Sequence, residues 1–247
     1  VDDAVDQRGS QKFASGEETN VDAEYYDNVF TQRVNLWMTH EGVRELWESA
    51  GMVFGRFLTC LEFGLEGKGD GMAIWHDQAL IKEPWANPTS PHVDNVYWSF
   101  SSPHAGSLWV ALDDATLQNG CLHFAPGTHK LLRWGEDAGE DAYLEVKIGK
   151  NMGDMFSHPS LVASPTPVTM RPYEMRAGSL SFHNGLTVHA AGPNFTPYRR
   201  RAMTLQMMPL NAKFNGIQNI LPDHRFKSLT LNSPLLPHDD NPILFKR

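Results

Sequence analysis

Short apolar runs, each closed by a turn signal, dominate the middle of the chain. Runs of this kind, bounded by Gly, Pro and Asn, are typical of β-strands. They occupy residues 72–81, 107–112, 119–124, 168–170, 179–182, 187–190 and 201–208. Seven or eight short strands without an internal repeat predict a mainly β fold of the jelly-roll or double-stranded β-helix type, which is cupin-like.

A helical period precedes these runs. Phe30, Val34 and Trp37 recur at i, i+4 and i+7, so residues 25–47 are expected to form two helical pieces. Residues 52–66 are apolar and end in a glycine-rich turn, which predicts a further helix. Helices of this kind are expected to flank the sheet from outside, which gives an α+β arrangement.

Three segments interrupt the regular pattern. Residues 1–24 are polar and are expected to form a mobile N-terminal arm, which the initial Val in place of Met suggests is truncated upstream. Residues 25–247 are expected to form a single domain. Within it, residues 131–167 lack regularity and carry an acidic run, which predicts a lid-like insertion. The tail from residue 211 onward is expected to be mostly irregular.

Composition narrows the classes of partner. A chain of 247 residues with 41% hydrophobic content suits one domain with a sizeable core. A net charge of −8 argues against nucleic acid or an anionic membrane, and no apolar run approaches membrane-spanning length. The two cysteines, Cys60 and Cys121, form no CxxC pair, so free thiols and a cytoplasmic location are expected. The expected partner is a small molecule.

The candidate chemistry begins at His92-Val93-Asp94. In a strand, residues i and i+2 point to one face, so His92 and Asp94 are expected to converge. They provide two ligands of the 2-His-1-carboxylate triad that binds non-haem Fe(II). His183 and His189 compete for the third position, and a turn at Asn184-Gly185 would place them on different strands. The residues alone leave that choice open.

Three consecutive arginines follow the second histidine pair. An arginine that enters the next strand can bind a carboxylate in bidentate fashion, close to the metal without being its ligand. This position suits the far carboxylate of a 2-oxo acid chelated on iron. Alternation does not select among the three, because Arg199 and Arg201 share one face and Arg200 takes the other.

These motifs, in this order, resemble the phytanoyl-CoA dioxygenase family. The resemblance runs from about residue 30 to the C-terminus and rests on His92–Trp98, Trp109–Thr116, Asn119–Leu122, Pro126–His129 and Ala177–Asn194. Family members are Fe(II)- and 2-oxoglutarate-dependent oxygenases with a double-stranded β-helix. The resemblance implies iron ligands at His92, Asp94 and His189. It also implies that Arg200, eleven residues after His189, binds 2-oxoglutarate.

The resemblance implies further cosubstrate contacts. Trp109 corresponds to a residue that lines the cosubstrate pocket, Gln78 to one that contacts 2-oxoglutarate, and Arg33 to a basic residue on a helix. Two positions depart from the family pattern: Val93 replaces the usual Gln or Arg, and Ala191 replaces a hydroxyl residue, which removes one hydrogen bond to the cosubstrate. The carboxylate of Asp94 favours hydroxylation or another oxidation over halogenation.

The implied function is an Fe(II)- and 2-oxoglutarate-dependent dioxygenase that uses O2 to hydroxylate or otherwise oxidise a small organic substrate, with release of succinate and CO2. Two other classes stay open: a cupin-like hydrolase or isomerase with another divalent metal, and a non-catalytic metal-binding protein of this fold. Arg200 argues against the first class, and the intact ligand set argues against the second. Eight residues are candidates for an apolar substrate pocket, with ordinary core packing as the alternative for each: Trp85, Tyr97, Trp98, Phe100, Trp134, Met152, Met155 and Phe156.

Overall fold

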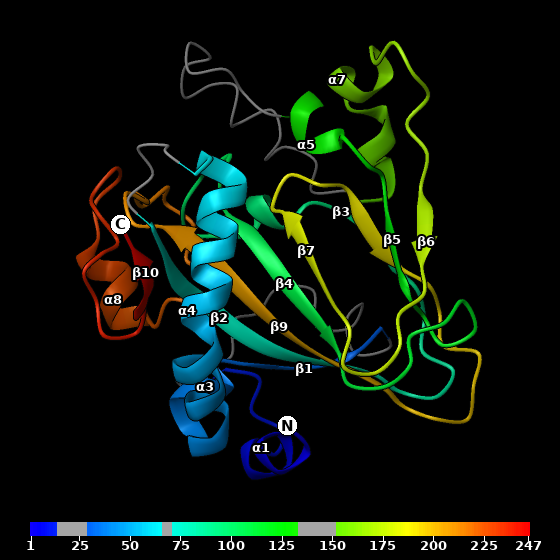
Figure 1. Ribbon diagram of the computed structural model, residues 1–247, viewed down its shortest axis with the longest axis horizontal. Helices are drawn as coiled ribbons and strands as arrows, with labels where there is room; N and C mark the ends of the chain where they lie inside the picture. The colour runs from blue at the N-terminus through cyan, green and yellow to red at the C-terminus, as the bar shows by residue number, and fades with distance from the viewer. Residues whose placement is uncertain (14–28, 66–70, 133–151) are drawn as a thin grey trace.

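Two antiparallel β-sheets form the centre of the molecule (Figure 1). The computed structural model describes residues 1–13, 29–65, 71–132 and 152–247. The larger, six-stranded sheet contains β1 (Thr31–Val34), β2 (Gly71–Lys82), β4 (Gly106–Ala111), β7 (Leu180–Asn184), β9 (Arg200–Pro209) and β10 (Ile243–Lys246). The smaller, four-stranded sheet contains β3 (Thr89–His92), β5 (Leu122–Phe124), β6 (Arg171–Tyr173) and β8 (His189–Ala191). The predicted mainly β, jelly-roll fold is confirmed.

The order of the strands shows how the chain crosses between the sheets. The larger sheet has the order β1-β2-β9-β4-β7, with β10 paired to β2, and the smaller has the order β3-β8-β5-β6. Strands β7 and β8 are consecutive in the chain but belong to different sheets, and the turn after Asn184 separates them. The predicted separation of His183 and His189 therefore occurs, and it places them in opposite sheets.

Helices cover one face of the larger sheet and the ends of the molecule (Figure 1). They are α1 (Asp2–Arg8), α3 (Leu36–Thr39), α4 (Glu41–Phe63), η1 (Asp94–Val96), α5 (Thr128–Leu131), η2 (Met152–Ser157), α7 (Pro159–Val162) and α8 (Asp223–Ser228). Helix α4 includes the helix predicted from residue 52 and ends at Gly64 with a φ of 76°. No helix in the described ranges is long and apolar enough to cross a membrane.

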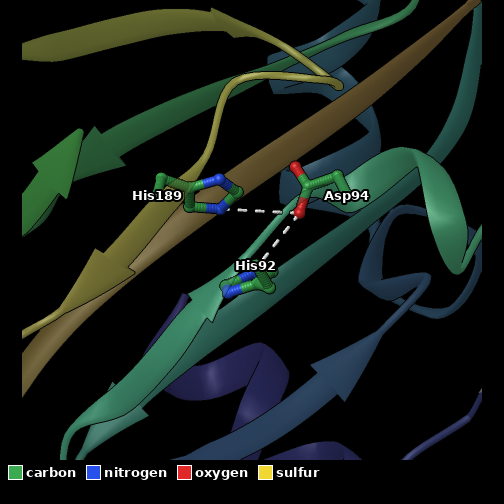
Figure 2. Close-up of side chains that lie close together, drawn as sticks. All are labelled: His92, Asp94 and His189. Atoms are coloured by element: carbon green, nitrogen blue, oxygen red, sulfur yellow. Dashed lines mark ion pairs between the residues drawn. The ribbon is translucent and has the colours of Figure 1, made fainter. Parts of the chain in front are cut away.

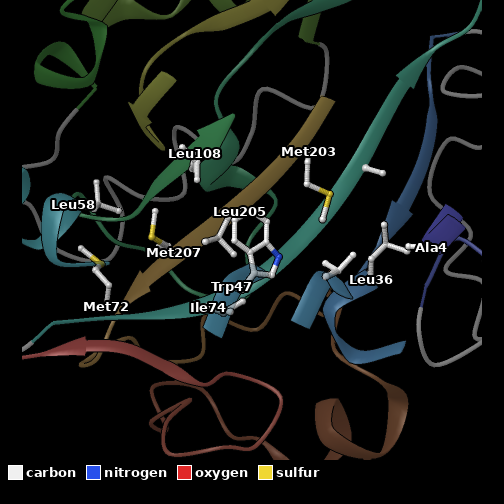
Figure 3. Close-up of a cluster of buried hydrophobic side chains, with 12 residues drawn as sticks. Ala4, Leu36, Trp47, Leu58, Met72, Ile74, Leu108, Met203, Leu205 and Met207 are labelled. Carbon is white, nitrogen blue, oxygen red and sulfur yellow. The ribbon is translucent and has the colours of Figure 1, made fainter. Parts of the chain in front are cut away.

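The main hydrophobic core lies between α4 and the larger sheet (Figure 3). Trp47 and Leu58 of α4 pack in one cluster with Leu108, Leu205 and Met207 of the sheet. Because side chains alternate along a strand, this apolar face leaves the opposite face for polar residues. That opposite face lies toward the interior between the two sheets and carries the candidate site residues of β2, β4 and β9.

A register shift in β2 sets which of its residues face that interior. Ile74 is opposite Met207 and His76 is opposite Gln206, so Trp75 has no partner on β9. Trp75 instead packs with Trp98 and Phe100 in a second core. Trp98 and Phe100, two of the candidates for an apolar pocket, are therefore buried in this core, which is the alternative of ordinary packing.

The N-terminal residues differ from the predicted mobile arm. Residues 2–8 form α1, and the Arg8 guanidinium donates hydrogen bonds to the carbonyl oxygens of Val34 (2.8 Å) and Asn35 (3.0 Å) and to the Thr39 hydroxyl (2.6 Å). The polar composition did not reveal this packing, because the partners of Arg8 lie far along the chain. Residues 14–24 lie outside the described residues.

Three further predictions are corrected or only partly tested. Residues 31–34 form strand β1 instead of a helix, since Asn35 takes a left-handed conformation (φ 55°) that separates β1 from α3. After residue 211, α8 and β10 add regular structure. Within 131–167, residues 133–151 lie outside the described residues, while η2 and α7 bury Met155 and Leu161 beside β3. The lid-like role of this segment stays a prediction.

Candidate active site

His92 and Asp94 converge for a reason slightly different from the predicted one. Strand β3 ends at His92, and Asp94 begins the 3-10 turn η1. Val93 between them has an extended backbone (φ −120°, ψ 143°) and buries its side chain in a cluster with Leu186 and Val188. The alternation of a strand thus persists through Val93 and directs His92 and Asp94 to the other side.

His189 reaches the same point from β8. His92 and His189 are direct partners in the β3–β8 pair, and their ring centroids are 4.2 Å apart. The Nε2 atoms of His92 and His189 lie 3.6 Å and 3.5 Å from Oδ1 of Asp94 (Figure 2). One ligand atom from each residue lies within 4.8 Å of the others. Two imidazole nitrogens and a carboxylate oxygen so arranged suit a non-haem metal ion.

Backbone carbonyls orient both rings. Nδ1 of His92 lies 2.8 Å from the Ser90 carbonyl oxygen, and Nδ1 of His189 lies 3.0 Å from that of Thr187. A carbonyl only accepts, so each Nδ1 carries the proton and each Nε2 presents a lone pair. Burial and the neighbouring His92 lower the pKa of His189 to about 3, which keeps it neutral. Burial opposes ionisation of Asp94, but the three surrounding histidines hold its pKa well below the usual range.

His183, the other histidine candidate, occupies a different place. Its Nε2 lies 3.4 Å from Oδ2 of Asp94, whereas His92 and His189 both approach Oδ1. Among the described residues, the group that could hold a metal ion consists of His92, Asp94 and His189. The geometry therefore favours His189 as the third ligand, in agreement with the resemblance.

Arg200 lies at the start of β9 and is only 3% exposed. Its Nη2 donates to the Gly120 carbonyl oxygen (3.1 Å), its guanidinium lies 5.4 Å from the Trp109 ring centroid, and its Nε has no hydrogen-bond partner in the described part of the chain. Burial lowers the pKa of Arg200 to about 10, so it remains charged at neutral pH. A buried guanidinium with an unused donor suits a carboxylate ligand.

A second buried cation, Lys82, lies beside Arg200. Lys82 on β2 is directly opposite Arg200 on β9 and is 1% exposed. Its Nζ donates to the carbonyl oxygens of Val29 (3.3 Å) and Asn87 (2.5 Å). Within the described ranges neither cation forms an ion pair with a carboxylate, so the two charges lack a neutralising anion. The sequence analysis missed Lys82, although it lies four residues after Gln78 and shares its face.

The other residues that were expected to contact the cosubstrate lie on two different faces of the larger sheet. Gln78 faces the interior opposite Thr204, and Trp109 is also opposite Thr204 on the far side of β9. Arg33 is opposite Ala79, which belongs to the core under α4, so its side chain lies on the other face. The Arg33 guanidinium donates to the carbonyl oxygens of Gly9 (2.6 Å) and Gln32 (2.8 Å).

The structure therefore does not bring Arg33 to the site, because a strand replaces the helix on which it was expected. The β1 residue that reaches the interior is Gln32, whose Nε2 donates to Oε1 of Gln78. The structure does bring together Gln78, Trp109 and Arg200, which share the interior face of β2, β4 and β9. Ala191 also lies in the buried cluster around Trp109, where it offers no hydroxyl.

Comparison with known proteins shows the family of this chain. The family model described as "Phytanoyl-CoA dioxygenase (PhyH)" matches residues 18–202. Curated relatives include phytanoyl-CoA dioxygenase 1 of Oryza sativa subsp. japonica, 28% identical over 61% of this chain and 51% of its own length. Phytanoyl-CoA dioxygenase of Arabidopsis thaliana is 32% identical over 59% of this chain and 49% of its own length. The chain thus spans about half the length of these relatives.

Solved structures give the same fold. The carbocyclase SnoK from nogalamycin biosynthesis, described as non-heme and alpha ketoglutarate dependent, has a TM-score of 0.64 and 21% identity over 87% of this chain and 76% of its own. The epimerase SnoN in complex with Fe3+, alpha ketoglutarate and nogalamycin RO has a TM-score of 0.63 and 25% identity over 88% of this chain and 79% of its own. The predicted cofactors, Fe(II) with 2-oxoglutarate and O2, are those of the matched family, and the chain belongs to the phytanoyl-CoA dioxygenase family.

Proposed function

We propose that this protein is an Fe(II)- and 2-oxoglutarate-dependent dioxygenase that hydroxylates or otherwise oxidises a small organic substrate and releases succinate and CO2. One observation carries the proposal. A ligand set of His92, Asp94 and His189 shares the interior of the β-helix with the buried, unneutralised cation Arg200. Either feature alone occurs in other protein classes, but a metal ligand set combined with a buried carboxylate site suits a metal-chelating 2-oxo diacid.

Each residue has a defined task in this proposal. His92, Asp94 and His189 would hold Fe(II), and the neutral His189 and the ionised Asp94 are already in the states of metal ligands. When bound, the iron supplies the oxidative chemistry with O2 and 2-oxoglutarate. Arg200 binds the far carboxylate of the cosubstrate through its free Nε donor, and Lys82 adds a second positive charge. Trp109 and Ala191 bury this end and exclude water.

The proposal includes oxidations other than hydroxylation. SnoN and SnoK are named an epimerase and a carbocyclase, so similar folds support outcomes other than hydroxylation. A small-molecule substrate is supported by the net charge of −8, which argues against nucleic acid or an anionic membrane as partner. Cys60 and Cys121 are free thiols, which supports the predicted cytoplasmic location.

The competing class is a cupin-like hydrolase or isomerase that uses the same metal ligands without a 2-oxo acid. Such an enzyme has no need for a buried arginine beside a buried lysine, and leaving the Arg200 charge without an anion would be costly. The two classes differ in a product, because only the dioxygenase converts 2-oxoglutarate to succinate.

Anaerobic titration of the metal-free protein with Fe(II) and 2-oxoglutarate tests the proposal. We expect a visible metal-to-ligand charge-transfer band that weakens in Asp94→Ala and in Arg200→Ala. Admission of O2 should then yield succinate. A protein that binds iron but shows neither the band nor succinate would exclude the dioxygenase and favour the hydrolase or isomerase class.

A further inference from the structure

We propose that Ser107 and His183 are positioning residues that bind one oxygen of Asp94 and so leave its other oxygen for the metal. The inference rests on the proposed metal site, but it depends neither on the cosubstrate nor on the reaction. Nothing in the ligand set itself requires it, since the three ligands would be complete without Ser107 or His183.

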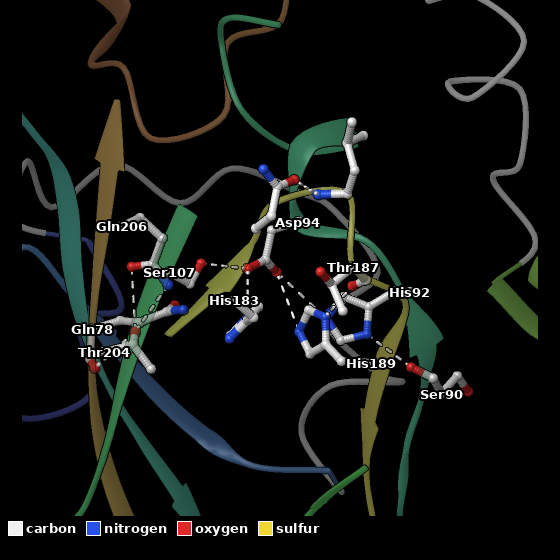
Figure 4. Close-up of polar contacts among 12 residues, drawn as sticks. Gln78, Ser90, His92, Asp94, Ser107, His183, Thr187, His189, Thr204 and Gln206 are labelled. Atoms are coloured by element: carbon white, nitrogen blue, oxygen red, sulfur yellow. Dashed lines mark hydrogen bonds and ion pairs between the residues drawn. The ribbon is translucent and has the colours of Figure 1, made fainter. Parts of the chain in front are cut away.

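The two oxygens of Asp94 have separate sets of neighbours (Figure 4). The Ser107 hydroxyl donates to Oδ2 over 2.6 Å, and Nε2 of His183 lies 3.4 Å from the same oxygen. Oδ1 is the oxygen that both His92 and His189 approach, at 3.6 Å and 3.5 Å. Each oxygen of the carboxylate therefore has a distinct environment, one toward the ligand set and one toward the larger sheet.

The fold explains why these two residues meet at Oδ2. Ser107 on β4 and His183 on β7 are direct partners in the larger sheet, so their side chains share one face. His92 and His189 are direct partners in the smaller sheet. Asp94 lies between the two pairs, and a pair of residues from each sheet contacts one of its oxygens. The position of the carboxylate is thus set by both sheets.

Asp94 is the main polar contact of His183 among the described residues. His183 is 8% exposed, it packs 5.1 Å from the Phe124 ring centroid, and its ring nitrogens make no hydrogen bond to any other described residue. A buried imidazole without a polar contact is costly, so the contact with Asp94 is the one that accounts for a histidine here. Contacts of this kind typically change metal affinity 10–100-fold.

The direction of the effect follows from the geometry. A carboxylate whose Oδ2 is engaged is held in one rotamer and presents Oδ1 alone. Without these contacts the side chain gains freedom, and ordering it costs free energy when a metal binds. Loss of Ser107 or His183 should therefore weaken metal binding even though no ligand is removed.

The test is Co(II) binding to the 247-residue chain, measured by titration through the visible absorption of the bound ion. Ser107→Ala and His183→Phe remove the contacts, and His183→Gln restores a donor. We expect a loss of affinity of roughly 10-fold or more in the first two variants and partial recovery in the third. Matched controls are Ser99→Ala and His123→Phe, whose side chains contact the carbonyl oxygens of Gln218 (2.9 Å) and Cys121 (3.2 Å), and both should bind Co(II) like the parent.

Three results would overturn the inference. The first is a Co(II) affinity that stays within about twofold of the parent in folded Ser107→Ala and His183→Phe, because loss of a positioning contact typically changes metal affinity about 10–100-fold. The second is loss of one imidazole from the bound ion in His183→Phe, detected by X-ray absorption, which would make His183 a ligand. The third is absence of Co(II) binding in the parent, which would overturn the proposed function as well. Circular dichroism identifies a variant that does not fold, in which case Ser107→Ala, which only removes a hydroxyl, decides.

Discussion

Lys82 on β2 lies directly opposite Arg200 on β9, and both side chains are buried on the interior face of the larger sheet. Like charges on directly opposite residues repel, and burial in a medium of low dielectric strengthens the repulsion. An anion between or beside them would relieve it. We therefore predict that a negatively charged group of the ligand binds at this pair, a prediction that does not depend on the metal ligands.

Replacing Lys82 tests this assignment. Lys82→Met should weaken 2-oxoglutarate binding to the metal-loaded protein about 10-fold or more, as loss of a charged hydrogen bond would, while metal affinity stays unchanged. Isothermal titration calorimetry measures both affinities. Arg201→Met is the matched control, because Arg201 faces the other way and pairs with Asp113 and Asp2. If Lys82→Met binds 2-oxoglutarate as tightly as the parent, the role of Lys82 is limited to its hydrogen bonds with the Val29 and Asn87 carbonyl oxygens.

The same pair predicts a pH dependence of cosubstrate binding. Burial and the nearby Arg200 lower the pKa of Lys82 from 10.5 to about 7. A bound carboxylate favours the protonated amine, so the complex holds a proton that the free protein releases above pH 7. Affinity for 2-oxoglutarate should therefore fall as the pH rises from about 7 to 9.

Proton uptake on binding can be measured by calorimetry in buffers of different ionisation enthalpy. Arg200 does not contribute in this window, because its pKa stays near 10. Lys82→Met should remove the uptake. A wild-type protein that takes up no proton at pH 8 would contradict the assignment.

Asp77 predicts a pH dependence of stability on the other face of β2. Burial raises its pKa from 3.8 to about 7, although Oδ2 accepts hydrogen bonds from the Trp47 indole (2.8 Å) and the Trp37 backbone (3.1 Å). Between about pH 4 and 7 the folded protein thus binds this proton more tightly than the unfolded chain. The contribution of Asp77 to stability is present below pH 4 and is lost as the pH rises through 7.

Denaturant unfolding at pH 5 and pH 7.5 checks this expectation. Asp77→Asn keeps an acceptor for Trp47 and should lose less stability than the wild type between the two pH values. Asp77→Ala leaves the indole N–H without its partner and should cost about 1–3 kcal/mol. Equal pH dependence in the wild type and Asp77→Asn would show that Asp77 does not titrate in this range.

Arg8 should contribute to stability without affecting the site. Arg8→Met removes the hydrogen bonds to Val34, Asn35 and Thr39, which should destabilise the fold by roughly 2–3 kcal/mol. Hydrogen exchange should quicken in β1 and α3, whereas metal affinity should stay at the parent value. Arg44→Met, whose guanidinium makes exposed hydrogen bonds to the backbone of Trp37 and Met38, is the control. Equal stability of Arg8→Met and the wild type would mean that α1 does not anchor β1.

Much of the site could be predicted from the sequence because its residues lie in short motifs with fixed spacing. His92 and Asp94 are separated by one extended residue, and Arg200 begins a strand whose alternation continues to Gln206. The choice between His183 and His189 could not be made from spacing. It depends on which strand pairs with β3, a contact between residues about a hundred positions apart.

The positions of Arg33 and Lys82 could not be predicted from the local sequence pattern. Phe30, Val34 and Trp37 have helical spacing only by coincidence, because a strand, a left-handed Asn35 and a helix share that stretch. Tertiary pairing with β2 outweighed local periodicity there. Lys82 was overlooked because nothing in the sequence shows that β9 places an arginine opposite it.

Side chains alternate along β2, so the number of paired residues decides which face of the sheet each side chain occupies. Ahead of Trp75, Ile74 faces α4, and beyond it Ala79 faces α4 while Gln78 and Lys82 face the interior. Trp75 is the one residue between Ile74 and Lys82 whose deletion would keep this alternation, because Ile74 and His76 already lie opposite the consecutive residues Met207 and Gln206. Deletion of a paired residue between His76 and Lys82 would instead exchange the two sets and move Lys82 to the face of the apolar core. A length change of one residue between His76 and Lys82 would thus be far more damaging than most substitutions there, and a homologous chain could keep this site only if that paired stretch kept the same parity.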